Sequence, residues 1–111
     1  MQIDIMGAAW TISEKTEQEE PRLENADGIC DWTTRSIVIR KGDDGTLADM
    51  SRYIRKVTRH EIVHAFLIEC GLDESSAEMP AWARNEEMVD WFARLGPRIG
   101  KAWEAAGVAE W

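Results

Sequence analysis

Two histidines and the glutamate between them have the clearest capacity for chemistry in this sequence. His60, Glu61 and His64 form the pattern HExxH inside the segment RHEIVHAFLIEC. In a helix, residues four positions apart lie about 40° apart around the axis and one turn along it, so both imidazoles project from one side. Two imidazole nitrogens can then bind one zinc ion. Glu61 is turned about 100° from His60, which places it beside such an ion, where it can accept a proton from a metal-bound water.

The pattern also has a reading without chemistry. His60 and His64 are the only histidines of the chain, and both can be polar residues at the edge of the core of a metal-free protein. Chance placement of the two histidines and the glutamate in this pattern is rare, so the motif is informative. A purely structural zinc site has no need of a glutamate at position 61, and Glu61 therefore favours a catalytic site over a structural one.

A catalytic zinc site has three protein ligands and an open position for water. Cys70 is a poor third ligand, because on a continuous helix it points about 240° away from His64. The segment NEEMVDWFA at 85 to 93 offers carboxylates from a second helix. Glu74 and Glu78 are rival ligands in the connecting segment DESSAEMP, which is a less rigid support.

The motifs HEIVH and NEEMVD together resemble the gluzincin arrangement, in which a glutamate from a second helix joins an HExxH helix. The run EEMVDWFA is also similar to the ExxANxFA helix of ImmA/IrrE-type peptidases, small zincins common in phages and mobile elements. The resemblance implies zinc ligation by His60, His64 and Glu86, with Asp90 bracing the first of these histidines. Asp90 stands where the second family has Asn. A carboxylate one turn along the ligand's helix suits the bracing role, because zinc-bound histidines usually donate their other N–H to such a group.

The implied activity is that of a zinc-dependent metallopeptidase, with Glu61 as general base and a peptide or protein as substrate. Thermolysin-like enzymes stabilise the oxyanion with a Tyr and a His that follow the HExxH helix. Here no histidine follows His64 and the only tyrosine is Tyr53, upstream of the motif. We therefore expect weak or narrowly specific activity, with the oxyanion donor open among Tyr53, a backbone N–H and the arginines at 84, 94 and 98. The alternative is a non-catalytic zinc-binding interaction protein that retains the zincin fold.

The elements that must position these residues follow from hydrophobic periodicity. Apolar alternation over 2–13, interrupted near Gly7, and the segment GICDWTTRSIVIRK predict short strands, the second segment forming a hairpin. A long helix is expected from a cap at Thr46 or Asp49 to Gly71. A second helix is predicted from Pro80 to Gly96-Pro97, followed by a short helix that ends at Gly107.

These elements predict an α+β protein in which a small antiparallel sheet packs against the long HExxH helix and the helix that carries the third ligand. At 111 residues the chain fits one domain, spanning residues 1–111. Four tryptophans, at positions 10, 32, 82 and 91, are expected to fill its core.

Composition restricts the possible partners and the compartment. A formal net charge of −8 argues against nonspecific nucleic-acid binding, which depends on Lys and Arg at phosphates. No apolar run approaches the roughly 20 residues that span a bilayer. Cys30 and Cys70 are expected to be buried, unpaired thiols, and we place the protein in a cytoplasm.

Overall fold

The computed structural model of the chain describes residues 1–42, 48–75, 82 and 85–111. The order of elements is β1 (Gln2–Ile5), β2 (Ala8–Lys15), η1 (Pro21–Asn25), β3 (Gly28–Asp31), β4 (Ser36–Arg40), α1 (Met50–Glu69), α2 (Leu72–Ser75) and α3 (Glu86–Ala105). The α+β class is therefore confirmed. Among the described residues, no helix is both long and apolar enough to cross a membrane.

The four strands form one sheet in the order β1-β2-β4-β3. β1 and β2 form an antiparallel hairpin whose two turn residues, Met6 and Gly7, both have positive φ, as in a type I′ turn. β3 and β4 form a second antiparallel hairpin. The expected interruption near Gly7 and the expected hairpin are both confirmed.

The prediction of an antiparallel sheet is wrong at its centre, because β2 and β4 pair in parallel, with Thr11 opposite Ser36. The chain leaves β2, passes through the 3-10 helix η1, and enters β3 at the sheet edge. The β3–β4 hairpin then reverses it, so β4 runs in the direction of β2. Local alternation indicates strands but carries no information about which strands become neighbours.

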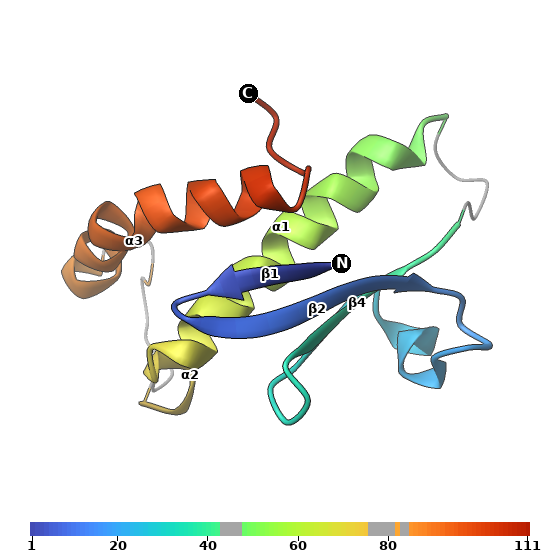
Figure 1. The fold of residues 1–111 in the computed structure, drawn as a ribbon, viewed down its shortest axis with the longest axis horizontal. Coiled ribbons are helices and arrows are strands. Elements are labelled where there is room, and N and C mark those ends of the chain that lie inside the picture. The colour runs from blue at the N-terminus through green and yellow to red at the C-terminus, as the bar shows by residue number, and fades with distance from the viewer. Residues whose placement is uncertain (43–47, 76–81, 83–84) are drawn as a thin grey trace.

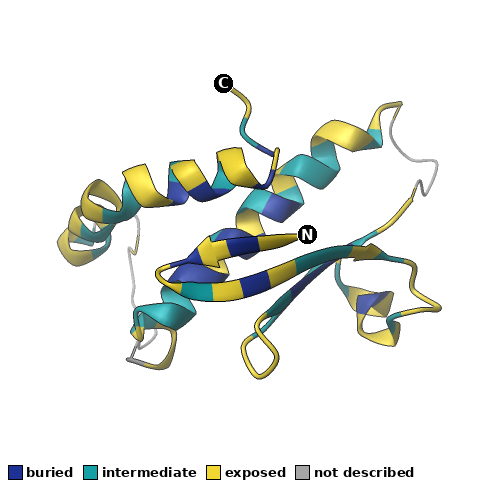
Figure 2. Ribbon diagram, in the orientation of Figure 1, coloured by how far each residue is buried: buried dark blue, intermediate teal, exposed yellow. Residues whose placement is uncertain are grey.

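The main core lies between the sheet and the two long helices. α1 packs against β3, β4 and β1, while α3 lies beside α1 and contacts β1 (Figure 1). The fully buried side chains there include Trp10 of β2, Ile37 of β4, Phe66 of α1 and Ile99 of α3. Figure 2 shows buried residues along the sheet and on the part of α1 that crosses it.

Capping residues set the ends of α1. Asp49 is the N-cap, and its side chain accepts a hydrogen bond from Ser51 N at 3.0 Å. Gly71 follows the C-cap residue Cys70 with a φ of 82°, the left-handed conformation that commonly terminates helices. Both predicted boundaries are confirmed, while the alternative cap Thr46 lies outside the described residues.

The predicted division of the C-terminal part into two helices is wrong. α3 runs without interruption from Glu86 to Ala105 and contains Pro97. Gly96 has no Cβ to clash with the proline ring, so the helical backbone is tolerated there. An apolar stripe also continues in register across the proline, at positions 91, 95, 99 and 102, and packs on the core. The predicted start at Pro80 lies outside the described residues.

Two tryptophans that were expected in the core are exposed. Trp32 lies in the turn between β3 and β4 and is 62% exposed, and Trp82 is 69% exposed. Trp10 is fully buried, as expected, and Trp91 is partly buried. The size of an aromatic side chain does not decide its burial. Burial also depends on whether the residue lies on a strand or helix that packs on the core or in a turn at the surface.

Candidate metal centre

His60 and His64 face one another on α1. Their Nε2 atoms are 3.1 Å apart, and their rings meet edge to face at 70°. Two ligand atoms of a tetrahedral zinc ion are separated by about 3.3 Å when each bond is 2.0–2.1 Å long. Neither histidine is buried. The pair therefore has the spacing and the access that a shared cation needs.

Glu61 completes the group from the inner side of the same helix. Its side chain is only 6% exposed, and one ligand atom from each of His60, Glu61 and His64 lies within 4.8 Å of the others. Burial raises the pKa of the Glu61 carboxyl, while the nearby His64 and His60 act in the opposite direction. Among the described residues this is the one group of such side chains that can hold a metal ion.

Gly28 on β3 allows Glu61 to lie against the edge of the sheet. A Cβ atom at position 28 would lie 2.9 Å from Cγ of Glu61 and 3.0 Å from Cγ1 of Val57. These distances are shorter than ordinary van der Waals contact, so a larger residue would push the carboxylate away. No motif in the sequence indicates this close approach, which depends on how strand and helix pack.

A cavity of about 270 Å³ lies beside His60 and Glu61. It is lined by Asp27, Gly28, Tyr53, Lys56, Val57, His60 and Glu61. Three of these side chains, Tyr53, His60 and Glu61, are among those predicted from the sequence as candidates for the reaction. Lys56 could have been found, because it precedes His60 by four positions and so lies on the same side of α1.

Tyr53, one of the candidate oxyanion donors, shares this cavity with His60 and Glu61. Its hydroxyl donates a hydrogen bond to Oδ2 of Asp27. The other oxygen of Asp27 lies 3.5 Å from Nε of Arg40. Each oxygen of the Asp27 carboxylate therefore has a partner of its own, Tyr53 for Oδ2 and Arg40 for Oδ1.

The structure does not bring Glu86 into the His60–Glu61–His64 group. Glu86 is the first residue of α3 and is exposed. Its role as third ligand stays a prediction. Of its rivals, Glu74 is exposed on α2, and Glu78 lies outside the described residues.

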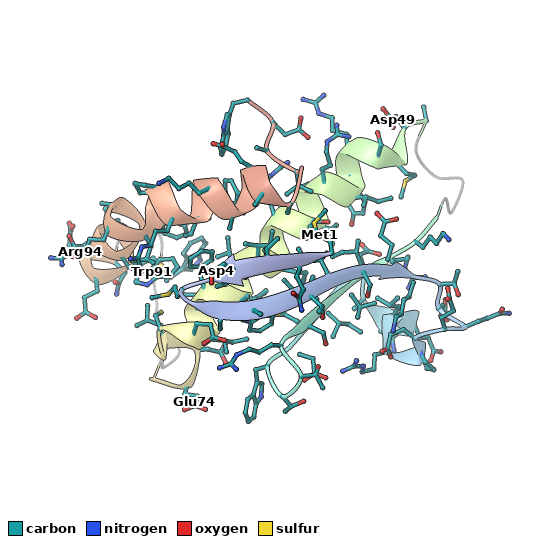
Figure 3. The ribbon with its side chains drawn as sticks, in the orientation of Figure 1. Met1, Asp4, Asp49, Glu74, Trp91 and Arg94 are labelled. Carbon is teal, nitrogen blue, oxygen red and sulfur yellow. The ribbon has the colours of Figure 1, made fainter. Side chains whose placement is uncertain are left out.

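Asp90, the predicted bracing residue, is also exposed, and it accepts a hydrogen bond from Arg94 at 2.9 Å. The two side chains are 64% and 74% exposed, respectively. Figure 3 shows the side chain of Arg94 pointing outward from α3, away from the sheet. The bracing role of Asp90 likewise stays a prediction.

The two cysteines are free, as predicted, but both are only partly buried rather than buried. Cys70 caps α1 and is not part of the metal-binding group. Burial, followed by the negative charges of Glu61, Asp73 and Asp31, raises the pKa of Cys30 to about 12. Such a thiol stays protonated near neutral pH and is a poor nucleophile or metal ligand there.

Comparison with protein-family models, with curated proteins and with solved structures finds no match for this chain.

Proposed function

We propose that the protein is a zinc-dependent metallopeptidase of the small gluzincin type. The observation that carries the proposal is the His60–His64 pair, with Nε2 atoms 3.1 Å apart and the buried carboxylate of Glu61 beside it. Two imidazole nitrogens at this spacing suit zinc as ligands, and the carboxylate of Glu61 lies close enough to act on a metal-bound water. We propose Glu86 as the third ligand and the cytoplasm as the compartment.

Glu61 acts as the general base. A zinc ion, when bound, supplies a Lewis acid and lowers the pKa of water toward 7. The Glu61 carboxylate takes a proton from the attacking water and passes it to the leaving amine. The backbone of Gly28 lies close against the side chain of Glu61 and restricts its movement during this transfer.

The free edge of β3 supports a peptide as substrate. Within the described residues, β3 is an outer strand of the sheet, bonded on one side to β4. Arg40 N donates to Asp27 O at 2.8 Å, and hydrogen-bonded pairs alternate along an antiparallel ladder. The backbone groups of Gly28 and Cys30 therefore face outward. An extended peptide can pair with them as an added strand next to Glu61.

The decisive experiment combines metal analysis with the substitution Glu61→Gln. The parent protein, purified without added zinc, should contain close to one equivalent of zinc and should hydrolyse peptides from a mixed-sequence library. Glu61→Gln should keep the zinc and lose at least about a hundredfold in turnover, because general-base catalysis is worth about 10²–10⁴-fold.

The matched control is Glu87→Gln, at an exposed position of α3, which should change neither zinc content nor turnover. An active Glu61→Gln protein would refute the assignment of the base. A zinc-free protein whose stability ignores chelators would refute the metal site itself.

A non-catalytic zinc protein that binds a partner is the second candidate. It is favoured by large apolar side chains that are exposed at positions close to Glu86 along the chain, namely Val89 (54%), Phe92 (44%) and Trp82 (69%). Exposed apolar side chains that gather in one place commonly mark binding surfaces. This candidate predicts full zinc content with no turnover in the parent protein.

A further inference from the structure

Lys56 lies on α1 one turn before the two histidines. Lys56, His60 and His64 follow one another at intervals of four residues and so lie in a row along one side of the helix. Lys56 and His60 both line the cavity beside Glu61. The Nζ atom of Lys56 lies 5.8 Å from the ring centroid of Tyr53, which lines the same cavity.

Lys56 differs from two neighbouring cations of α1 in its ion pairing. Two other cations of this helix, Arg55 and Arg59, share the carboxylate of Glu110, at 2.9 and 3.4 Å respectively. Within the part of the chain that the structure describes, no Asp or Glu forms an ion pair with Lys56.

The carboxylate of Asp27, on the cavity wall, is already bound by Tyr53 and Arg40. Lys56 is therefore a positive charge beside the cavity that is available to an anion from outside. The chain as a whole carries a net charge of −8, so a positive charge at the candidate site runs against the overall charge of the protein.

We infer that Lys56 binds a carboxylate of the peptide substrate. This inference rests on the proposed peptidase function and names the class of peptide that the site prefers. Four helical residues span about 6 Å, and an extended peptide advances about 3.4 Å per residue. The carboxylate held by Lys56 accordingly lies about two residues from the bond cleaved at the histidine pair. It comes either from the C-terminus of the peptide or from an Asp or Glu side chain.

The test measures binding rather than turnover. Zinc-loaded Glu61→Gln protein is titrated by calorimetry with acetyl-trialanine and with its C-terminal amide. A second pair of probes, acetyl-Ala-Asp-Ala amide and acetyl-Ala-Asn-Ala amide, separates a side-chain carboxylate from a terminal one. The carboxylate member of at least one pair should bind about tenfold more tightly, as a charge-assisted hydrogen bond provides.

Two variants with the same change in net charge locate the effect. Lys56→Met, added to Glu61→Gln, should abolish the preference for the carboxylate probe. Arg52→Met, at an exposed position of the same helix that does not line the cavity, should retain it. Circular dichroism and thermal melting should show both variants folded, since both positions are exposed.

The possible outcomes are distinct. The assignment of Lys56 is overturned if the preference for the carboxylate probe survives Lys56→Met. It is also overturned if the two probes of each pair bind with equal affinity. Absence of hydrolysis in the parent protein overturns the peptidase proposal instead. A carboxylate preference that depends on Lys56 would still establish the binding role in that case.

Discussion

The two long helices have the same length, 20 residues each, but differ in how the fold supports the residues assigned to the site. On α1, Glu61 lies between buried core residues and the close approach of Gly28, so its position is determined by packing. On α3, the buried residues Ile99 and Ala102 belong to the second half, while Glu86 and Asp90 lie in exposed first turns. Figure 2 shows this contrast along the two helices.

This difference shows which part of a metal site a local motif can place. Two histidines four apart face each other whenever their segment is helical, whatever surrounds it. A ligand from a second helix requires in addition that the two helices meet at a defined distance. The HExxH segment is helical in this structure, so the first condition is met. The second condition would require packing contacts around Glu86 and Asp90, and both of these residues are exposed.

The largest expected effect is on the free energy of unfolding, and it should differ between a phenylalanine on α1 and one on α3. Phe66 on α1 is 1% exposed, whereas Phe92 on α3 is 44% exposed. Phe66→Ala should lower the free energy of unfolding by about 3–5 kcal/mol, because it removes buried contacts and leaves a cavity. Phe92→Ala should change it by less than about 0.5 kcal/mol, as surface substitutions usually do. Urea denaturation measures both.

A loss of similar size in the two variants would contradict the contrast between the helices. It would show that the first half of α3 is packed in solution.

The sequence predicted α1 more accurately than α3. Its cap at Asp49, its end at Gly71 and the facing histidines depend on neighbours within a few residues along the chain. The continuous α3 and the parallel β2–β4 pair depend on contacts between distant segments. The apolar stripe that crosses Pro97 in register was nevertheless a usable signal for a continuous helix. No comparable signal indicates that Gly28 approaches Glu61.

The next prediction concerns the ligand that the first turns of α3 would supply. Glu86→Ala should weaken zinc binding by more than about a hundredfold if Glu86 is a ligand, because loss of an outer partner alone costs about 10–100-fold. Glu87→Ala, at the adjacent exposed position, should have no effect. Competition with a fluorescent zinc chelator measures both affinities. Equal affinities in the two variants and the parent would exclude Glu86, and a loss confined to Glu87→Ala would move the ligand by one residue.

A smaller effect is expected from adding one methyl group to a glycine in each region. Gly28→Ala places Cβ 2.9 Å from Cγ of Glu61, so it should destabilise the protein by about 1–3 kcal/mol and displace the carboxylate. Gly100→Ala on α3 places Cβ 3.6 Å from the ring of Trp111, which is ordinary contact. It should stabilise the protein by up to about 1 kcal/mol, because alanine favours a helix over glycine. Thermal unfolding of both variants would give shifts of opposite sign, and a stabilising Gly28→Ala would contradict the packing of Glu61 against β3.

The smallest effect compares the N-caps of the two helices. Asp49 caps α1 by accepting from Ser51 N at 3.0 Å, and Asn85 caps α3 by accepting from Met88 N at 2.8 Å. Asp49→Ala should cost about 1 kcal/mol in the free energy of unfolding, because the helix it starts contributes to the core. Asn85→Ala should cost less, because the exposed turns that it caps can fray without opening the core. Hydrogen exchange should then accelerate locally at the Met88 amide in Asn85→Ala while core amides keep their protection. Equal global losses in the two variants would mean that the first turns of α3 unfold together with the core, and Glu86 would then be held as firmly as Glu61.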